Sequence, residues 1–293
     1  MKFTDAARLI SAKDKEYPEL LKEIYDPPKE LHVLGALPIG APMVAVIGSR
    51  ITSDYGMRTA KAMAADLASA GVVVVSGMAT GIDTAAHEGA LSVGGKTIAV
   101  LGSGFSYLYP PENRKLAEKI SQNGALVTEY PAATKPHPAF FPRRNRIISG
   151  ISSAALVVEA RLKSGALITA DLALEQGRDV FAVPGNVDSL KSGGTNWLLK
   201  EGAHVARCAE DILETLGIQP AKKISKETKE MDEKGLSVEE KDLLSLFDSE
   251  PVHVDALLES SRLPASKTIS VLSLLEIKGR LKQLPGKNFV RIL

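Results

Sequence analysis

Short apolar runs alternate with segments of helical pattern through most of the chain, and this alternation limits the folds available to it. Strands that helices cover on both faces are apolar at consecutive positions, whereas a strand with one face in water alternates apolar and polar residues. Repeated strand–helix–strand crossovers predict an α/β fold with a doubly wound, mostly parallel sheet. The runs are Met43–Ile47, Val72–Val75, Thr97–Leu101, Ala125–Thr128, Ala154–Val158 and Val180–Val183.

The carboxyl ends of these predicted strands carry glycine, serine or charged residues. Ligands of doubly wound sheets bind beyond the carboxyl ends of the strands, so we expect the functional site at this edge. Glycine-rich turns before a helix offer free amides that hold phosphate. Asp83, near the start of the next helix, is explained equally well as a helix cap. The strand ends hold Gly48-Ser49-Arg50, Ser76-Gly77, Gly102-Ser103-Gly104, Glu129, Glu159 and Pro184-Gly185.

The segment 140–150 gathers several arginines around one asparagine. Arginine stays charged at neutral pH, and its planar fork of donors suits phosphate. If Pro142 opens a helix, the two arginines that are three positions apart share one face. No Asp or Glu lies between residues 131 and 155, so any carboxylate partner comes from elsewhere. The segment predicts an anion site, and the alternative is a solvated helix start. Its polar residues are Arg143, Arg144, Asn145 and Arg146.

Arg50 and Lys163 extend this basic set to two further strand ends. Because the carboxyl ends of parallel strands share one edge, we expect both side chains to converge with the arginines of segment 140–150. Such a cationic pocket favours a polyanion with several phosphates.

Two carboxylates and several aromatic residues lie near the same edge. Glu129 and Glu159 could form an acid/base pair or anchor Arg50 or Arg143 by ion pairs, and we favour the ion pairs. The aromatic residues could stack on bases or belong to the core, and we favour the core for the two phenylalanines. They are Phe140, Phe141 and Tyr107.

Composition and missing motifs exclude several classes of protein. Cys208 is the only cysteine, which excludes a disulfide framework and a zinc site of several cysteines. Tyr107 stands where a dinucleotide fingerprint needs its third glycine, no P-loop is complete, and the histidines are scattered. We therefore expect no cofactor and no metal. The N-terminus lacks a signal peptide, and no apolar run reaches the roughly 18 residues of a membrane span, so we expect a cytoplasmic protein.

The chain divides into four predicted parts. Residues 1–40 are expected to form an N-terminal extension, an arm or short helical segment packed on the main body. Residues 41–218 contain the doubly wound sheet, and the charged segment 219–235 is typical of a linker. Residues 236–293 show three helical patterns and a β-hairpin, the outline of a winged helix.

At these residues the chain resembles the DprA/Smf family of bacterial DNA-processing proteins of natural transformation. The matching motifs occur in order and at family spacing between residues 43 and 217. They are Gly48-Ser49-Arg50, Ser76-Gly77-x-Ala79-x-Gly81-Ile82-Asp83, Phe141-Pro142-x-Arg144-Asn145-Arg146-Ile147, Glu159-Ala160, Ser164-Gly165, Pro184-Gly185 and Gly194-Thr195-Asn196.

The resemblance implies an extended Rossmann-like fold and a non-enzymatic protein that binds single-stranded DNA. It further implies a homodimer that protects incoming DNA and helps to load the RecA recombinase. The family's DNA-binding pocket carries over to Arg50 and Lys163, with Arg144 and Arg146 lining it and Arg143 as a basic neighbour. The other expected contacts are Gly48, Ser49, Ser76, Gly77 and Asn145.

The chain departs from the family pattern at both ends. Its first 40 residues are too short for the helical SAM-like domain of many members. The winged helix carries few cations on its expected recognition helix, namely Lys267 and Lys278 with Arg262 before it, which favours a partner-binding module over duplex DNA.

Two other functions stay open. A phosphoribohydrolase of the related Rossmann group needs an unbroken Pro-Gly-Gly-x-Gly-Thr run, but here an insertion separates Pro184-Gly185 from Gly193-Gly194-Thr195. The third possibility is a duplex-binding regulator in which the winged helix is primary.

Overall fold

A computed structural model describes residues 6–219, 236–247, 251–261 and 263–291. Of the predicted linker 219–235, only Gln219 is among the described residues. Arg262 also lies outside them. The chain forms two compact units, Met1–Ala221 and Lys222–Leu293, and each is described separately.

The first unit is built on one nine-stranded sheet with the order β1-β2-β6-β5-β4-β3-β7-β8-β9. Seven strands, β3 to β9, run parallel, which confirms the predicted doubly wound sheet. The apolar runs became strands because helices cover both of their faces. These strands are β3 (Met43–Ile47), β4 (Val73–Ser76), β5 (Thr97–Val100), β6 (Gly124–Thr128), β7 (Ala154–Val157), β8 (Asp179–Ala182) and β9 (His204–Val205).

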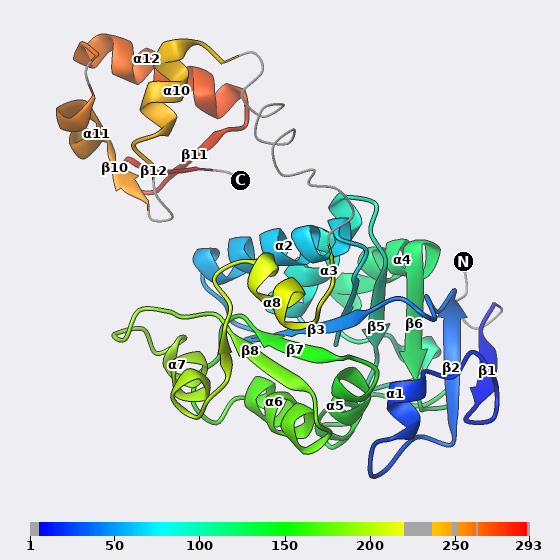
Figure 1. Ribbon diagram of the computed structural model, residues 1–293. Coiled ribbons are helices and arrows are strands. Elements are labelled where there is room, and N and C mark those ends of the chain that lie inside the picture. Colours follow the sequence, from blue (N-terminus) through cyan, green and yellow to red (C-terminus); the bar gives the residue numbers. More distant parts are fainter. Residues whose placement is uncertain (1–5, 220–235, 248–250, 262, 292–293) are drawn as a thin grey trace. The chain divides into compact units, whose positions relative to one another are not determined.

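Helices cover the two faces of the sheet, with α2, α3 and α8 on one face and α5 and α6 on the other (Figure 1). Ser53 caps the N-terminus of α2, where its side chain accepts a hydrogen bond from the Gly56 amide. The helices are α1 (Glu19–Lys22), α2 (Asp54–Ser69), α3 (Ile82–Ser92), α4 (Arg114–Asn123), α5 (Phe140–Gly150), α6 (Gly165–Glu175), α7 (Gly193–Lys200) and α8 (Ala209–Thr215), with 3-10 turns η1 (Phe105–Tyr107) and η2 (Pro111–Asn113).

Strand β3 shows how the sequence pattern becomes a two-sided core. Met43, Ala45 and Ile47 pack into the cluster under α5 and α6, while Val44 and Val46 pack into the cluster under α2 and α3. Side chains alternate across a strand, so a run that is apolar at every position is buried on both faces.

The strand order reverses between β3 and β7. From β3 the chain moves through β4, β5 and β6 on one side and then returns to place β7 on the other side. At such a switch point the flanking loops diverge and leave a crevice at the carboxyl ends of the two strands.

The N-terminal segment differs from the arm or helical extension that the sequence suggested. Strand β2 (Glu30–Gly35) pairs antiparallel with β6, and β1 (Arg8–Ser11) pairs antiparallel with β2. The segment thus extends the main sheet, and α1 contributes Leu21 to its core.

The second unit is a winged helix, as the sequence predicted. Over its described residues the helices are α10 (Val238–Leu244), α11 (Val254–Ser260) and α12 (Ala265–Ile277). The hairpin of β11 (Leu281–Leu284) and β12 (Asn288–Arg291) gains a third short strand, β10 (Val252–His253), beside β12. Among the described residues of the chain, no helix is both long and apolar enough to cross a membrane.

Candidate functional site

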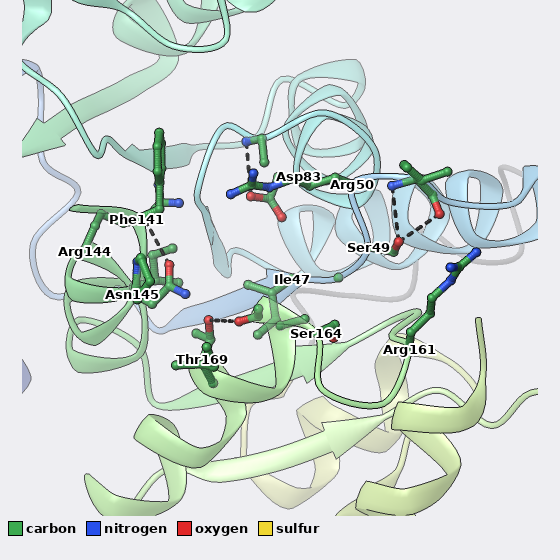
Figure 2. Close-up of a pocket in the computed structure, with 18 of the residues that line it drawn as sticks. Ile47, Ser49, Arg50, Asp83, Phe141, Arg144, Asn145, Arg161, Ser164 and Thr169 are labelled. Atoms are coloured by element: carbon green, nitrogen blue, oxygen red, sulfur yellow. Dashed lines mark hydrogen bonds between the residues drawn. The ribbon is translucent and has the colours of Figure 1, made fainter. Parts of the chain in front are cut away.

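A cavity of about 630 Å³ opens at the switch point between β3 and β7. The loops after β3 and β7 and the helices α5 and α6 form its walls, so segments far apart in sequence meet there (Figure 2). The residues that carry its chemistry are Ser49, Arg50, Asp83, Tyr109, Phe141, Arg144, Asn145, Arg161, Ser164 and Thr169.

Arg50 and Arg161 are the exposed cations of the cavity wall. Arg50 follows β3, and its guanidinium carbon lies 5.4 Å from the centre of the Phe141 ring, a cation–π contact that leaves its donors open. Arg161 follows β7 and is also exposed. Across the described parts of the chain, neither side chain has a carboxylate within ion-pair distance.

Lys163 lies in the same loop as the wall residues Arg161 and Ser164 but is not itself one of the lining residues. Its side chain is exposed, and no acidic partner for it occurs among the residues that the structure describes. Its backbone φ is 60°, a left-handed conformation that is uncommon for residues other than glycine and often found at functional sites.

Arg144 has a different role, because it is 4% exposed and already bound to the protein. Its guanidinium donates to the carbonyl oxygens of Gly77, at 2.7 Å, and Val100. Burial lowers the pKa of Arg144 to about 10, an effect that nearby Asp83 opposes, so the side chain stays charged at neutral pH. Arg144 therefore adds positive charge to the floor of the cavity while it holds two strand ends together.

Asp83 is the acidic residue in the cavity wall. Its carboxylate accepts hydrogen bonds from the amides of Gly77 and Ala79, at 3.1 and 3.2 Å. Burial raises the pKa of Asp83, and the charge of Arg144 opposes this effect. The Asp83 side chain thus binds the loop before α3. It is not the N-cap residue that the sequence allowed, because Gly81 occupies that position.

The predicted serine and glycine contacts divide into two pairs. Gly48 and Ser49 line the cavity. Ser76 and Gly77 support it from behind: the Ser76 hydroxyl donates to the Val46 carbonyl. A Cβ on Gly77 would lie 2.6 Å from the Arg144 guanidinium, so only glycine permits this arginine to close over the strand end.

Arg146 does not line the cavity, which corrects the sequence prediction. Its guanidinium binds Glu129 at 2.7 Å and Asp26 at 3.2 Å and is buried between α5 and the strand edge. Arg143 is exposed and lies 3.7 Å from the same Glu129. The two arginines share one helix face, as their spacing predicted, but Arg144 and Asn145 occupy the face that meets the cavity.

The two strand-end glutamates are both engaged. Glu129 pairs with Arg143, as favoured from the sequence, and also with Arg146, which was not expected. Glu159 does not pair with an arginine; it accepts hydrogen bonds from the Thr52 hydroxyl and from the amide and hydroxyl of Ser53, at 2.6 to 2.9 Å. Its oxygens therefore fix the start of α2.

Sequence reasoning missed Arg161 and Tyr109 as wall residues. Arg161 lies between the Glu159-Ala160 and Ser164-Gly165 motifs, so its place at a strand end was a usable signal. Tyr109 follows η1 in an irregular loop, and its ring centre lies 5.5 Å from that of Phe141. Nothing in the local sequence separates it from Tyr107, which lies outside the wall.

The site is suited to bind an anion rather than to transfer protons. Arg50 and Arg161 present positive charges on the wall, and Lys163 follows Arg161 closely in the same loop. The wall carries Asp83 as its carboxylate, already bound to two amides. Among the described residues, no group of three or more His, Cys, Asp or Glu side chains could hold a metal ion.

Two family models match the chain. One, described as DNA recombination-mediator protein A, covers residues 8–217, and one, described as DprA winged helix domain, covers residues 227–287. The first match begins at β1, so the N-terminal strands belong to the shared part. Protein Smf of Escherichia coli (strain K12) is 40% identical over 289 residues, which cover 97% of this chain and 77% of the relative.

Two solved structures share the fold. The X-ray structure of DNA processing protein A from Streptococcus pneumoniae has a TM-score of 0.69 and 42% identity, covering 73% of this chain and 75% of that one. The protein of the same name from Helicobacter pylori, whose structure concerns its single-stranded DNA binding mode, has a TM-score of 0.66 and 32% identity. That match covers 74% of this chain and 98% of the other.

Proposed function

The chain belongs to the DNA recombination-mediator protein A family, the DprA/Smf proteins, and from this premise we propose that it binds single-stranded DNA in the switch-point cavity. Arg50, Arg161 and Lys163 contact the sugar-phosphate chain. Gly48, Ser49 and Asn145 line the path, and Arg143 is a basic neighbour at the edge of α5. Ser76, Gly77 and Arg144 hold the floor beneath it.

One observation supports the proposal: two exposed arginines, Arg50 and Arg161, line the cavity, Lys163 lies in the same loop as Arg161, and among the described residues none of the three has a carboxylate partner. An unpaired cation keeps its full attraction for a phosphate, whereas Arg146, bound to Glu129, does not. Phosphate contacts are independent of base identity, so the proposal includes little sequence preference and a steep dependence on salt.

The proposal extends to the biological role. The bound strand is protected and passed to a RecA recombinase in the cytoplasm, and the chain acts as a homodimer. The family description, a recombination mediator, and the single-stranded DNA named for the Helicobacter pylori relative support this role.

The proposal contains no catalytic step. A phosphoribohydrolase-like reaction would need a free carboxylate at the site, but Glu129 and Glu159 are each bound to other groups. A duplex-binding role of the winged helix has equally little support, because Lys267 in α12 pairs with Glu239 and Lys278 pairs with Glu240.

The test is the affinity for fluorescent oligo-dT of the Arg50→Ala/Lys163→Ala protein, measured by anisotropy at 0.1 M salt. Each phosphate contact on a single strand contributes about 0.7 to the slope of log K against log salt, so two lost contacts weaken binding about 25-fold at this salt. The matched control is Lys96→Ala/Lys200→Ala, which removes two exposed lysines, one just before β5 and one at the end of α7. We expect the control to stay within about twofold of wild type. Equal affinity of both double variants would reject the cavity as the DNA site.

A further inference from the structure

The loop between β4 and α3, residues 77–81, contributes Ala79 to the wall of the cavity. It also contains a residue with an unfavourable backbone conformation. Met78 is buried and has a φ of 62°. In this region the Cβ of an L-residue lies too close to the following carbonyl oxygen. The conformation therefore persists only where surrounding groups hold it, and such positions cluster at binding sites.

Asn113, from the turn η2 before α4, holds this residue from outside the loop. Its side-chain amide donates to the Met78 carbonyl oxygen and to the Thr84 hydroxyl, both at 2.9 Å. The Thr84 hydroxyl in turn donates to the Ala79 carbonyl oxygen at 2.8 Å. Asn113 is buried, so water does not replace these bonds at low cost. The carbonyls of Met78 and Ala79 thus depend on the side chains of Asn113 and Thr84. Neither side chain lines the cavity.

Asp83 and Arg144 bind further polar groups of the loop. The Gly77 and Ala79 amides donate to Asp83, and the Gly77 carbonyl accepts from Arg144. The loop is thus held by Asp83 and Arg144 and also by Asn113, which supplies its contact to the turn η2.

The loop in turn fixes the backbone that carries Arg50. The Ile82 amide donates to the Ser49 carbonyl at 3.1 Å, and the Thr80 hydroxyl donates to the Arg50 carbonyl at 3.4 Å. A Cβ on Gly81 would lie 2.3 Å from the Ser49 oxygen, so the two loops are in direct contact. A change in the Met78 conformation must therefore move the segment 49–50.

We propose that Asn113 and Thr84 are positioning residues for DNA binding. They hold Met78 in its left-handed conformation and thereby keep Arg50 at the cavity rim before DNA arrives. This inference rests on the proposed function. Asn113 and Thr84 lie outside the site, and their role is to hold Arg50, one of its cations, in place before DNA binds. Without them the loop relaxes, and binding must restore the strained conformation.

The test compares Thr84→Val, which removes the hydroxyl with little change of shape, with Thr84→Ser, which retains it. Asn113→Ala is measured beside Asn123→Ala, an exposed asparagine at the end of α4 whose amide bonds only within its own helix. We expect oligo-dT affinity to fall about tenfold in Thr84→Val and Asn113→Ala, which is about 1.4 kcal/mol, the order of the cost of the left-handed conformation. Thr84→Ser and Asn123→Ala stay within about twofold of wild type.

A second readout separates positioning from stability. The slope of log K against log salt should stay at the wild-type value in Thr84→Val, because every cation is still present and reaches its phosphate in the complex. A merely structural role would lower the unfolding midpoint and leave the affinity of the folded protein unchanged. Unchanged affinity in Thr84→Val, or a salt slope lowered as by loss of Arg50, overturns the inference. If Asn113→Ala does not fold, the valine–serine pair at residue 84 decides.

The two proposals fail in different ways. If Arg50→Ala/Lys163→Ala loses affinity but Thr84→Val does not, the positioning role is wrong and the DNA site stands. If neither variant loses affinity, the site itself is wrong.

Discussion

Replacing Arg144 with methionine should destabilise the first unit strongly, because this buried arginine holds the floor of the cavity. The substitution keeps most of the side-chain volume but leaves the Gly77 and Val100 carbonyls without their donor and Asp83 without its nearby cation. A buried acceptor that loses its partner costs about 1–3 kcal/mol, so the two carbonyls together account for about 2–6 kcal/mol. Since Asp83 keeps its two amide donors, we expect a total loss of about 3–5 kcal/mol.

Urea denaturation followed by tryptophan fluorescence measures this loss in the intact chain. The single tryptophan, Trp197, lies in α7, so its signal reports the first unit and not the winged helix. The free energy of unfolding follows from the midpoint and the slope of the transition. Arg50→Met is the control, because this arginine is exposed, and its effect should stay within about 0.5 kcal/mol.

A second substitution tests the electrostatic part of the reasoning. In the Arg144→Met background, Asp83→Asn removes the buried charge that has lost its counter-charge, and we expect a coupling energy of about 1–3 kcal/mol. If Arg144→Met unfolds within 1 kcal/mol of wild type, or if the two substitutions are additive, the assignment of Arg144 to the floor is refuted.

Two further predictions concern the described ion pair and a buried histidine. Glu129→Gln leaves Arg146 without its buried carboxylate and should lower the stability of the first unit by about 3 kcal/mol. The salt slope of oligo-dT binding should equal that of wild type, and a steeper slope would mean that an arginine released from Glu129 contacts DNA. Burial lowers the pKa of His87 to about 3 in the folded state, compared with 6.5 in the unfolded state. Below pH 6.5 only the unfolded state binds the proton, so the stability decreases as the pH is lowered. Between pH 7 and pH 5 the free energy of unfolding should decrease by about 2 kcal/mol, because the slope of about 1.4 kcal/mol per pH unit applies only below pH 6.5. Denaturation curves of His87→Leu should show the pH dependence reduced by that amount. An identical pH dependence would contradict a neutral buried His87.

The sequence predicted the parallel strands β3 to β8 because they are buried on both faces and therefore largely apolar, whereas β9, two exposed residues long, left no such pattern. The antiparallel strand β2 was missed because it lies near one edge of the sheet and in a segment with many prolines. Of its residues only Leu31, Val33 and Leu34 are buried. Its place beside β6 depends on pairing between residues that are 90 to 96 positions apart in the sequence, from Gly35 with Ala125 to His32 with Thr128. Local pattern does not encode such a pairing.

The site was predicted as a set of strand ends, and the topology of the sheet brings several of those ends to one cavity. Arg50 lines this cavity for that reason, and Lys163 lies in the loop that also carries the wall residues Arg161 and Ser164. That these residues bind DNA stays a prediction. The face of α5 was assigned wrongly: spacing placed Arg143 and Arg146 together, but spacing does not say whether that face meets the cavity or Glu129. This choice depends on how α5 packs on the sheet, where Ile147 and Ile148 enter the core.

The central claim is that Arg50 and Lys163 hold phosphates, and the salt dependence of oligo-dT binding tests it most directly. The slope of log K against log salt should fall in magnitude by about 1.4 between wild type and Arg50→Ala/Lys163→Ala, because each contact on a single strand contributes about 0.7. The control Lys96→Ala/Lys200→Ala should keep the wild-type slope. An unchanged slope in the Arg50→Ala/Lys163→Ala protein would contradict the claim, whatever its affinity at one salt concentration.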